Sequence, residues 1–156
     1  MEIITEAKAF IASYGSPQWQ NSYNDPGVFI DDIKQGKQYV LCVDDSVEGV
    51  FLLDTYEKTY DIVYGGAFTK TTYYVIHRLA FSNAIRGKGY VRYVFDYVKK
   101  LVEEENIESI RIDTHKLNIP MQRALEKHGF IYVGIIHLLG NQIDNERLAY
   151  EYVKVE

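Results

Sequence analysis

The sequence predicts a single α/β domain in which a mixed, mostly antiparallel sheet of about six to seven strands carries helices on both of its faces. Three observations lead to this fold class. The chain has 156 residues, a length typical of one domain. Some segments have apolar residues at every third or fourth position, which indicates helices. Other segments alternate apolar and polar residues or are continuously apolar, which indicates strands. No internal repeat and no linker rich in Ser, Gly or Pro divides residues 1–156.

The first two predicted elements are helices. Residues 5–14 carry apolar side chains at helical spacing and precede Gly15, a common helix end. The second helix has Asp25 as its N-cap and Pro26 in its first position, and it ends at Gly36. The apolar residues that we expect this helix to bury are Phe29, Ile30 and Ile33.

Three strands are predicted next. Residues 38–43 and 47–55 flank a short polar turn and form a hairpin. Residues 72–81 are rich in β-branched and aromatic side chains and are apolar on both faces, as expected for a central strand. The segment 61–70 before it favours neither helix nor strand.

A long helix over residues 89–105 has the strongest amphipathic pattern of the chain. Asn118 and Gly129 bound the last helix, because Asn is a frequent N-cap and Gly a frequent C-terminal stop. The elements that complete the chain are strand 109–114, helix 118–128, strand 131–138 and strand 147–155.

Composition and charge exclude several classes of protein. With 47% hydrophobic residues, 25% charged residues and three Pro, the chain is neither disordered nor collagen-like. A net charge of −5 gives no basic footprint for nucleic acid. The single cysteine, Cys42, excludes an internal disulfide and a multi-thiolate metal site, and we expect it to be buried and inert.

Two further expectations concern metals and membranes. No His, Asp and Glu cluster has the spacing of metal ligands, so no metal is predicted. The N-terminus is acidic and amphipathic, and no apolar run approaches the ~20 residues that a membrane span needs. We therefore expect a cytoplasmic protein without a membrane partner.

The stretch from Leu79 to Val91 carries the chemistry. A buried strand runs into a glycine-bearing loop, and the loop opens onto the long helix. The first turn of a helix has unpaired N–H groups and a partial positive charge, which favour an anion. Gly87 and Gly89 let the backbone approach a phosphate, and Arg86 adds positive charge. The pattern predicts an anion cradle, with a tight strand-to-helix turn as the structural alternative.

Other phosphate-binding motifs fit less well. A Walker loop needs Gly-Lys followed by Ser or Thr after a four-residue gap, and the chain has none. A dinucleotide fingerprint needs three spaced glycines, and Val91 and Arg92 interrupt that series.

Two sequence blocks resemble the GNAT superfamily of N-acetyltransferases. The run Arg86-Gly87-Lys88-Gly89-Tyr90-Val91 resembles the pyrophosphate loop Gln/Arg-x-x-Gly-x-Gly/Ala of that family, with Val91 in place of the usual small residue. The second block has Asn118 at a helix start, and it closes with Glu126-Lys127-His128-Gly129-Phe130, similar to the family's Glu-Lys-x-Gly-Phe. Both blocks stand in the family's order and on the expected elements.

The resemblance implies a GNAT-like fold that binds acetyl-CoA as co-substrate between two parallel strands that splay apart, ending near Phe81 and Thr114. Backbone groups of the first strand would pair with the pantetheine arm, and the glycine-bearing loop would hold the pyrophosphate. For Asn118 the alternative is a plain N-cap. The residues that the resemblance assigns to the cofactor are Leu79, Ala80, Phe81, Arg86, Gly87, Lys88, Gly89, Tyr90, Val91, Arg92 and Asn118.

Acetyl transfer to an amine needs a base, because an ammonium must lose its proton before it attacks. His77 is the first candidate, since alternation along a strand places it on the face of Leu79 and Phe81, and histidine has a reference pKa of about 6.5. A buried structural histidine is the alternative. Asp113 is the second candidate, where some family members have a carboxylate, with a structural hydrogen-bond acceptor as the alternative. Leu125 replaces the tyrosine that serves many members as general acid.

The resemblance places the amine acceptor at the first two helices, their connecting loop and the loop between the last two strands. Aromatic faces and carboxylates there suit a cation, although core packing is the alternative for most of the tyrosines. We expect His115, by contrast, to lie at the surface. The candidate acceptor residues are Trp19, Gln20, Tyr23, Asn24, Tyr64, Tyr73, Tyr74, Asn141, Asp144 and Glu146.

The sequence therefore predicts an N-acetyltransferase that moves acetyl from acetyl-CoA to a primary amine of a small molecule, by direct attack in a ternary complex. One alternative is a protein or peptide acceptor. Another is a non-catalytic acyl-CoA-binding regulatory module, which the residues at Val91 and Leu125 leave open. Exposed strand edges are compatible with a homodimer.

Overall fold

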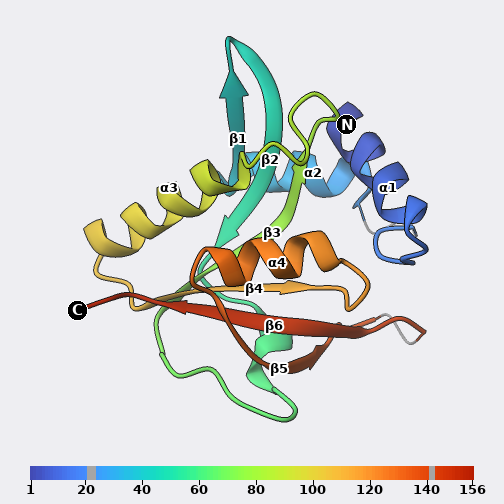
Figure 1. The fold of residues 1–156 in the computed structure, drawn as a ribbon. Helices are drawn as coiled ribbons and strands as arrows, with labels where there is room; N and C mark the ends of the chain where they lie inside the picture. Colours follow the sequence, from blue (N-terminus) through green and yellow to red (C-terminus); the bar gives the residue numbers. More distant parts are fainter. Residues whose placement is uncertain (21–23, 141–142) are drawn as a thin grey trace. The chain divides into compact units, whose positions relative to one another are not determined.

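The computed structural model describes residues 1–20, 24–140 and 143–156. In these residues every predicted helix and strand is present in the predicted order (Figure 1), with ends that differ by a few residues at most. The elements are α1 (Glu2–Ser13), α2 (Pro26–Lys34), β1 (Gln38–Val43), β2 (Ser46–Asp54), the short 3-10 helix η2 (Lys58–Asp61), β3 (Tyr73–Phe81), α3 (Val91–Glu104), β4 (Ser109–Thr114), α4 (Ile119–Lys127), β5 (Ile131–His137) and β6 (Glu146–Val153).

The described strands follow the order β1-β2-β3-β4-β6-β5 in the sheet. Neighbouring strands pair antiparallel in β1 with β2, β4 with β6, and β5 with β6. Strands β3 and β4 pair in parallel, with Tyr73 opposite Ser109 and Val75 opposite Arg111. The mixed, mostly antiparallel sheet that the sequence predicts is therefore confirmed, with six strands in the described residues.

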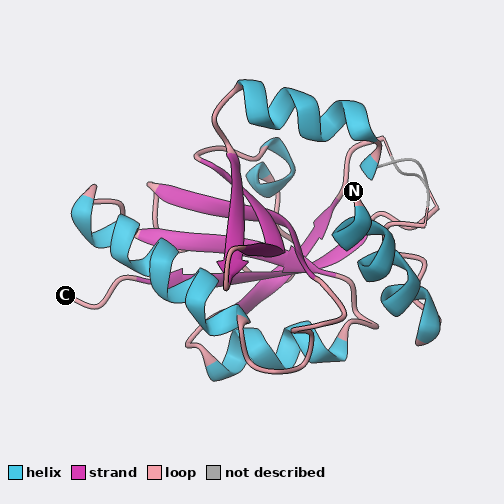
Figure 2. Ribbon diagram, turned by 90° about the horizontal axis from the view of Figure 1, so that it is seen from above, coloured by secondary structure: helices cyan, strands magenta, loops and turns pink. Residues whose placement is uncertain are grey.

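The described chain forms two compact units. The first unit comprises Met1–Leu53 and Ile76–Tyr90, and the second comprises Asp54–Val75 and Val91–Glu156, without the five residues outside the description. Strand β3 belongs to both, because its first three residues lie in the second unit and the rest in the first. Each unit has helices as well as strands, and Figure 2 distinguishes the helices from the strands by colour.

One buried cluster of the first unit is aliphatic. Ile4 and Ala7 of α1 and Ala80 of β3 are buried together, and the partly buried side chains that pack on them are Ile3, Trp19, Phe29 and Val50. Burial of these side chains removes apolar surface from water, which is the main stabilising contribution to such a unit.

Two expectations about burial in the first unit are wrong. Ile30 and Ile33 of α2 are 50% and 63% exposed, because this helix turns its Phe29 and Asp32 side inward instead. Cys42 is also exposed. It lies on the same outward-facing side of β1 as Val40, where alternation along the strand places both away from the core.

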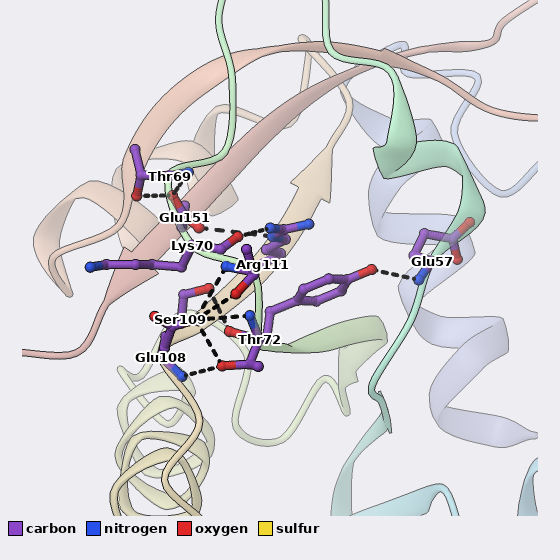
Figure 3. A network of polar contacts seen from close by, with 10 residues as sticks. Glu57, Thr69, Lys70, Thr72, Glu108, Ser109, Arg111 and Glu151 are labelled. Carbon is purple, nitrogen blue, oxygen red and sulfur yellow. Dashed lines mark hydrogen bonds and ion pairs between the residues drawn. The ribbon is translucent and has the colours of Figure 1, made fainter.

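The second unit has a buried apolar cluster and a buried charged pair. Tyr60, Tyr73, Val75, Ile136 and Ala149 form one buried cluster. Beside it, strands β4 and β6 place Arg111 opposite Glu151, with the two side chains 8% and 2% exposed (Figure 3). The rings that flank the Arg111 guanidinium are Tyr73 at 3.7 Å and Phe68 at 4.0 Å.

Candidate functional site

Strand β3 is irregular at the point where the candidate cofactor residues begin. Arg78 has a φ of 48°, in the left-handed region that L-residues avoid within strands. Such a residue interrupts the alternation of side chains, so the phase that connects His77 with Leu79 and Phe81 in the sequence does not continue through Arg78. His77, Leu79 and Phe81 are each half-buried, and Ala80 between them is buried.

The loop after β3 is held by two carboxylates of the first unit. The Asn83 backbone N–H donates to Glu6 Oε2 of α1 at 2.6 Å. The Ser82 hydroxyl donates to the Glu48 carboxylate of β2, and the Arg86 N–H donates to the Ser82 carbonyl at 3.0 Å. These hydrogen bonds fix the conformation of the loop just before Gly87.

Gly87 and Gly89 have the properties that an anion cradle requires. Both adopt left-handed backbone conformations, with φ of 74° and 82°. A Cβ built on either would meet no atom within 4 Å, so the backbone there faces open space. None of the hydrogen bonds of the described residues uses the backbone N–H of Gly87 or Gly89. These groups remain able to donate to a phosphate.

The Arg86 side chain contacts its own loop and helix α1, all within the first unit. Its Nη2 donates to the Phe81 carbonyl at 2.6 Å, and its other terminal nitrogen donates to Asn83 Oδ1. The guanidinium also lies over the Phe10 ring, at 4.7 Å from the centroid. Burial lowers the pKa of Arg86, and the nearby Glu6 acts against that shift. Arg86 therefore fixes the shape of the loop, a role that its basic character alone does not indicate.

The remaining cradle residues are more open. Lys88 is exposed, Tyr90 is half-buried, and α3 begins with the half-buried Val91. The Arg92 guanidinium is exposed and lies over the neighbouring Tyr93 ring at 5.0 Å.

In the second unit, Asn118 is the N-cap of α4, as predicted. Its Oδ1 accepts the Met121 N–H at 3.2 Å, while its own N–H donates to the His115 carbonyl at 2.9 Å. Because the side-chain oxygen accepts this hydrogen bond, the Asn118 side chain is held at the first turn of α4.

His115 is buried, which corrects the expectation that it lies at the surface. Its Nδ1 accepts the Leu117 N–H at 3.1 Å and its Nε2 is 2.9 Å from Asp144 Oδ1. Because Nδ1 accepts a hydrogen bond, the ring proton of the neutral histidine lies on Nε2 and is donated to Asp144. Asp144 also lies 3.4 Å from Nη2 of the buried Arg147. Both ring nitrogens are thus engaged: Nδ1 bonds within the loop after β4, and Nε2 joins that loop to the one between β5 and β6.

Asp113 is partly buried at the end of β4 and is already hydrogen bonded. The hydroxyl of the buried Tyr60 donates to Asp113 Oδ2 at 2.7 Å. No local sequence pattern indicates this contact, because the two residues are 53 positions apart. Leu125, at the position of the family's usual tyrosine, is fully buried in the core.

The candidate acceptor residues have varied surroundings. In the first unit Trp19 packs on the core, Gln20 donates to the Lys8 carbonyl at 3.0 Å, and Asn24 is buried. In the second unit Tyr73 is a core residue, and the Tyr74 hydroxyl donates to Glu105 Oε2 at 2.5 Å. The exposed Tyr64 ring stacks on the His137 ring with 4.7 Å between the centroids, and Glu146 is exposed. Tyr23 and Asn141 lie outside the described residues.

The predicted cofactor residues fall in both units. Leu79 to Phe81 and the loop from Arg86 to Tyr90 belong to the first, and Val91, Arg92 and Asn118 belong to the second. Across residues 1–20, 24–140 and 143–156, no helix is long and apolar enough to cross a membrane. In the same ranges, no three His, Cys, Asp or Glu side chains gather as a metal site requires.

Comparison with known proteins agrees with the two sequence blocks. The sequence profile described as "Acetyltransferase (GNAT) family" matches residues 7–130. No curated protein matches the chain.

Solved structures give the same family. A GNAT acetyltransferase from Streptococcus agalactiae 2603 is 34% identical, with a TM-score of 0.83, over 99% of this chain and 87% of the other. A putative acetyltransferase from Staphylococcus aureus Mu50 is 27% identical, with a TM-score of 0.70, over 98% and 89%. An aminoglycoside 6'-N-acetyltransferase complexed with coenzyme A shares the fold at 11% identity and a TM-score of 0.64, over 98% and 91%. From the profile match and the 34% identical relative, this chain belongs to the GNAT family of N-acetyltransferases.

Proposed function

We propose that this acetyltransferase takes its acetyl group from acetyl-CoA and transfers it to a primary amine of a small molecule. The observation that carries the proposal is the open backbone at Gly87 and Gly89 just before α3, whose N–H groups donate to no other group in the described part of the chain. A diphosphate is the group that such a cradle suits, because it is a compact anion with many acceptor oxygens.

Each cofactor-binding residue has a distinct part in this proposal. Backbone groups of Leu79, Ala80 and Phe81 pair with the pantetheine arm. The diphosphate is bound by the backbone from Gly87 to Arg92, which includes Tyr90 and Val91. Lys88 and Arg92 are exposed and add positive charge. Arg86 keeps the loop in shape through the Phe81 carbonyl. Asn118 contributes its amide nitrogen, which the helix cap leaves unused.

His77 is the base that we propose for the amine. It is half-buried on the strand that leads into the cofactor residues. The imidazole would accept the ammonium proton and the neutral nitrogen would form the C–N bond. As the C–S bond breaks, the second proton of that nitrogen would pass to the departing thiolate, which leaves an amide and a free thiol. When bound, acetyl-CoA supplies the activated acetyl thioester. Asp113 is the second candidate base, and it is the weaker one because one of its oxygens already accepts the Tyr60 hydroxyl.

Binding and turnover test this proposal separately. Thermal unfolding is measured with acetyl-CoA, CoA and ATP. A ligand at 100 times its dissociation constant adds about 2.7 kcal/mol, which is several degrees for a domain of this size. We expect a shift with acetyl-CoA and CoA, and none with ATP. The absence of a shift at millimolar acetyl-CoA would refute the proposal.

An amine panel then separates the acceptor classes. Polyamines, aminoglycosides and amino acids are compared with peptides that present a free N-terminus or lysine, and thiol release is followed. Turnover with a small amine supports the proposal, whereas turnover with peptides alone assigns a protein acceptor. A shift with acetyl-CoA but no turnover on any amine identifies a non-catalytic acyl-CoA-binding module.

A further inference from the structure

Strand β3 contains a residue whose backbone conformation is unfavourable for an L-amino acid. Arg78 has a φ of 48° although it has a Cβ and lies within a strand. A non-glycine residue keeps such a conformation only where its surroundings hold it there. The residues that follow it directly are Leu79, Ala80 and Phe81, whose backbone the proposed function assigns to the acetyl donor.

A side chain of α2 holds Arg78 in place. The Asp32 carboxylate forms an ion pair with Arg78 Nη2, and the two side chains are 13% and 10% exposed. The ring of Phe29, one turn earlier on the same helix, lies 5.6 Å from the Arg78 guanidinium carbon. The Arg78 Nε is buried and has no hydrogen-bond partner among residues 1–20, 24–140 and 143–156. Asp32 is therefore the carboxylate that anchors this guanidinium.

The burial of the Asp32–Arg78 pair indicates that it positions β3 rather than stabilising the fold. Two buried charges lose hydration that their attraction repays only when the geometry is good, so an apolar pair stabilises a core as well or better. What a charged pair adds is a directed bond between one point of α2 and one point of β3. That bond explains why α2 turns Asp32 inward and leaves Ile30 and Ile33 exposed.

We propose that Asp32 is a positioning residue for acetyl transfer: through Arg78 it holds the irregular point of β3, and so sets the backbone of Leu79 to Phe81 against the acetyl donor. The inference rests on the proposed function. It connects α2 to the strand on which the thioester would lie. Displacing reacting groups by about 1 Å can cost on the order of 100-fold in rate.

The first variant is Asp32→Asn, which is nearly isosteric and leaves Arg78 without its anion. We expect kcat to fall about tenfold or more, because the acetyl group is misplaced. The Kd for CoA changes less than about threefold, since the glycine-bearing loop keeps its contacts. Asp31→Asn is the matched control, because the same change is made on the neighbouring exposed carboxylate of α2. It should leave both parameters within about twofold of wild type.

A double variant separates positioning from stability. Glycine adopts a positive φ without strain, so Arg78→Gly preserves the bend of β3 without an anchor. Combined with Asp32→Asn it removes both charges and leaves neither buried alone. We expect this double variant to recover most of the kcat that Asp32→Asn loses, although it lacks the ion pair entirely. If Asp32→Asn does not fold, the double variant still tests the idea, because it should fold and retain kcat within about threefold.

The outcomes are distinguishable. Failure of the wild-type protein to bind CoA or to turn over any amine removes the proposed function, and this inference with it. If the wild type is active, equal kcat for Asp32→Asn and Asp31→Asn removes only the inference. So does a double variant that is as impaired as Asp32→Asn, because the bend of β3 would then be present without restoring kcat.

Discussion

At the scale of single residues, hydrogen bonds that span long stretches of sequence determine what the polar side chains do. Glu108, just before β4, accepts four hydrogen bonds from the N–H and hydroxyl groups of Thr71 and Thr72. Thr69, in the same segment, donates to the buried Glu151 through both its N–H and its hydroxyl (Figure 3). The segment before β3 is irregular, and these carboxylates fix it.

The first prediction concerns the pH dependence that Glu108 confers on stability. Hydrogen bonds from Thr72 and Thr71 lower the pKa of Glu108 to about 2, from an ordinary value of 4.5. A carboxyl group with a lowered pKa in the folded state stabilises the fold above its unfolded-state pKa, and this contribution is lost as pH falls through the folded-state pKa. Glu108→Gln should therefore lower Tm at pH 7, and the difference from wild type should shrink between pH 4.5 and pH 2.

Thermal unfolding between pH 2 and pH 8 checks this prediction. Glu105→Gln is a poor control because Tyr74 donates to Glu105. Glu104→Gln is better, since Glu104 is exposed and its carboxylate pairs with the exposed Lys100 one turn away on the same helix. A Tm difference for Glu108→Gln that persists unchanged at pH 2 would contradict the assignment.

The second prediction concerns His77. If its neutral imidazole accepts the ammonium proton, kcat/KM depends on this side chain. His77→Ala should lower kcat/KM by about 100-fold, a size typical of general base catalysis, at the pH values where wild type is most active. A variant that keeps the wild-type kcat/KM would exclude His77 and leave Asp113 as the base to test.

Residue-scale expectations succeeded where the signal was local. Asn118 caps α4 because a cap depends on residues three positions apart. His115 was misjudged because its burial depends on Asp144 and Arg147, which come from another loop. The contact between Tyr60 and Asp113 is hidden for the same reason.

At the scale of elements, the sequence predicted the existence and order of the helices and strands well, and it predicted their faces less well. In α2 the spacing of Phe29, Ile30 and Ile33 is compatible with two different inward faces. The structure selects the one with Asp32, since Asp32 binds Arg78 of β3. Likewise, strand periodicity cannot reveal the left-handed residue within β3. The glycine-bearing loop was predictable, because it needs particular residue types at fixed positions.

The third prediction tests that loop with two alanine variants. Gly89→Ala and Gly36→Ala place a Cβ in left-handed conformations of 82° and 70°, and neither Cβ meets an atom within 4 Å. Both should lower stability by a similar amount, about 1 kcal/mol, because the backbone strain is alike. Only Gly89→Ala fills space at the proposed diphosphate site. We expect it to raise the Kd for CoA about tenfold or more, the effect of losing one charge-assisted hydrogen bond.

Calorimetric titration with CoA checks the third prediction, with Gly36→Ala as the matched control. If both variants bind CoA as tightly as wild type does, the phosphate does not approach Gly89. Equal losses of affinity would instead attribute the effect to stability.

At the scale of the whole molecule, two compact units share one family profile and one strand. The GNAT profile runs over residues 7–130 and so includes parts of both units. Strand β3 passes from the second unit to the first without a linker, and residues 73–81 stay in strand conformation throughout. The prediction of a single domain over residues 1–156 therefore becomes a prediction about cooperativity: neither unit should unfold alone.

The fourth prediction states this as a measurement. Ile4, in the core of the first unit, is 3% exposed, and Ile136, in the core of the second, is fully buried. Replacing either isoleucine with alanine should cost 2–5 kcal/mol, and so lower Tm by roughly 5–15 °C for a chain of this length. If the chain unfolds as one domain, each variant moves a single transition, and calorimetric and van't Hoff enthalpies agree. Acetyl-CoA should raise that same transition in both variants. Two transitions, of which Ile4→Ala moves one and Ile136→Ala the other, would show that the units unfold independently.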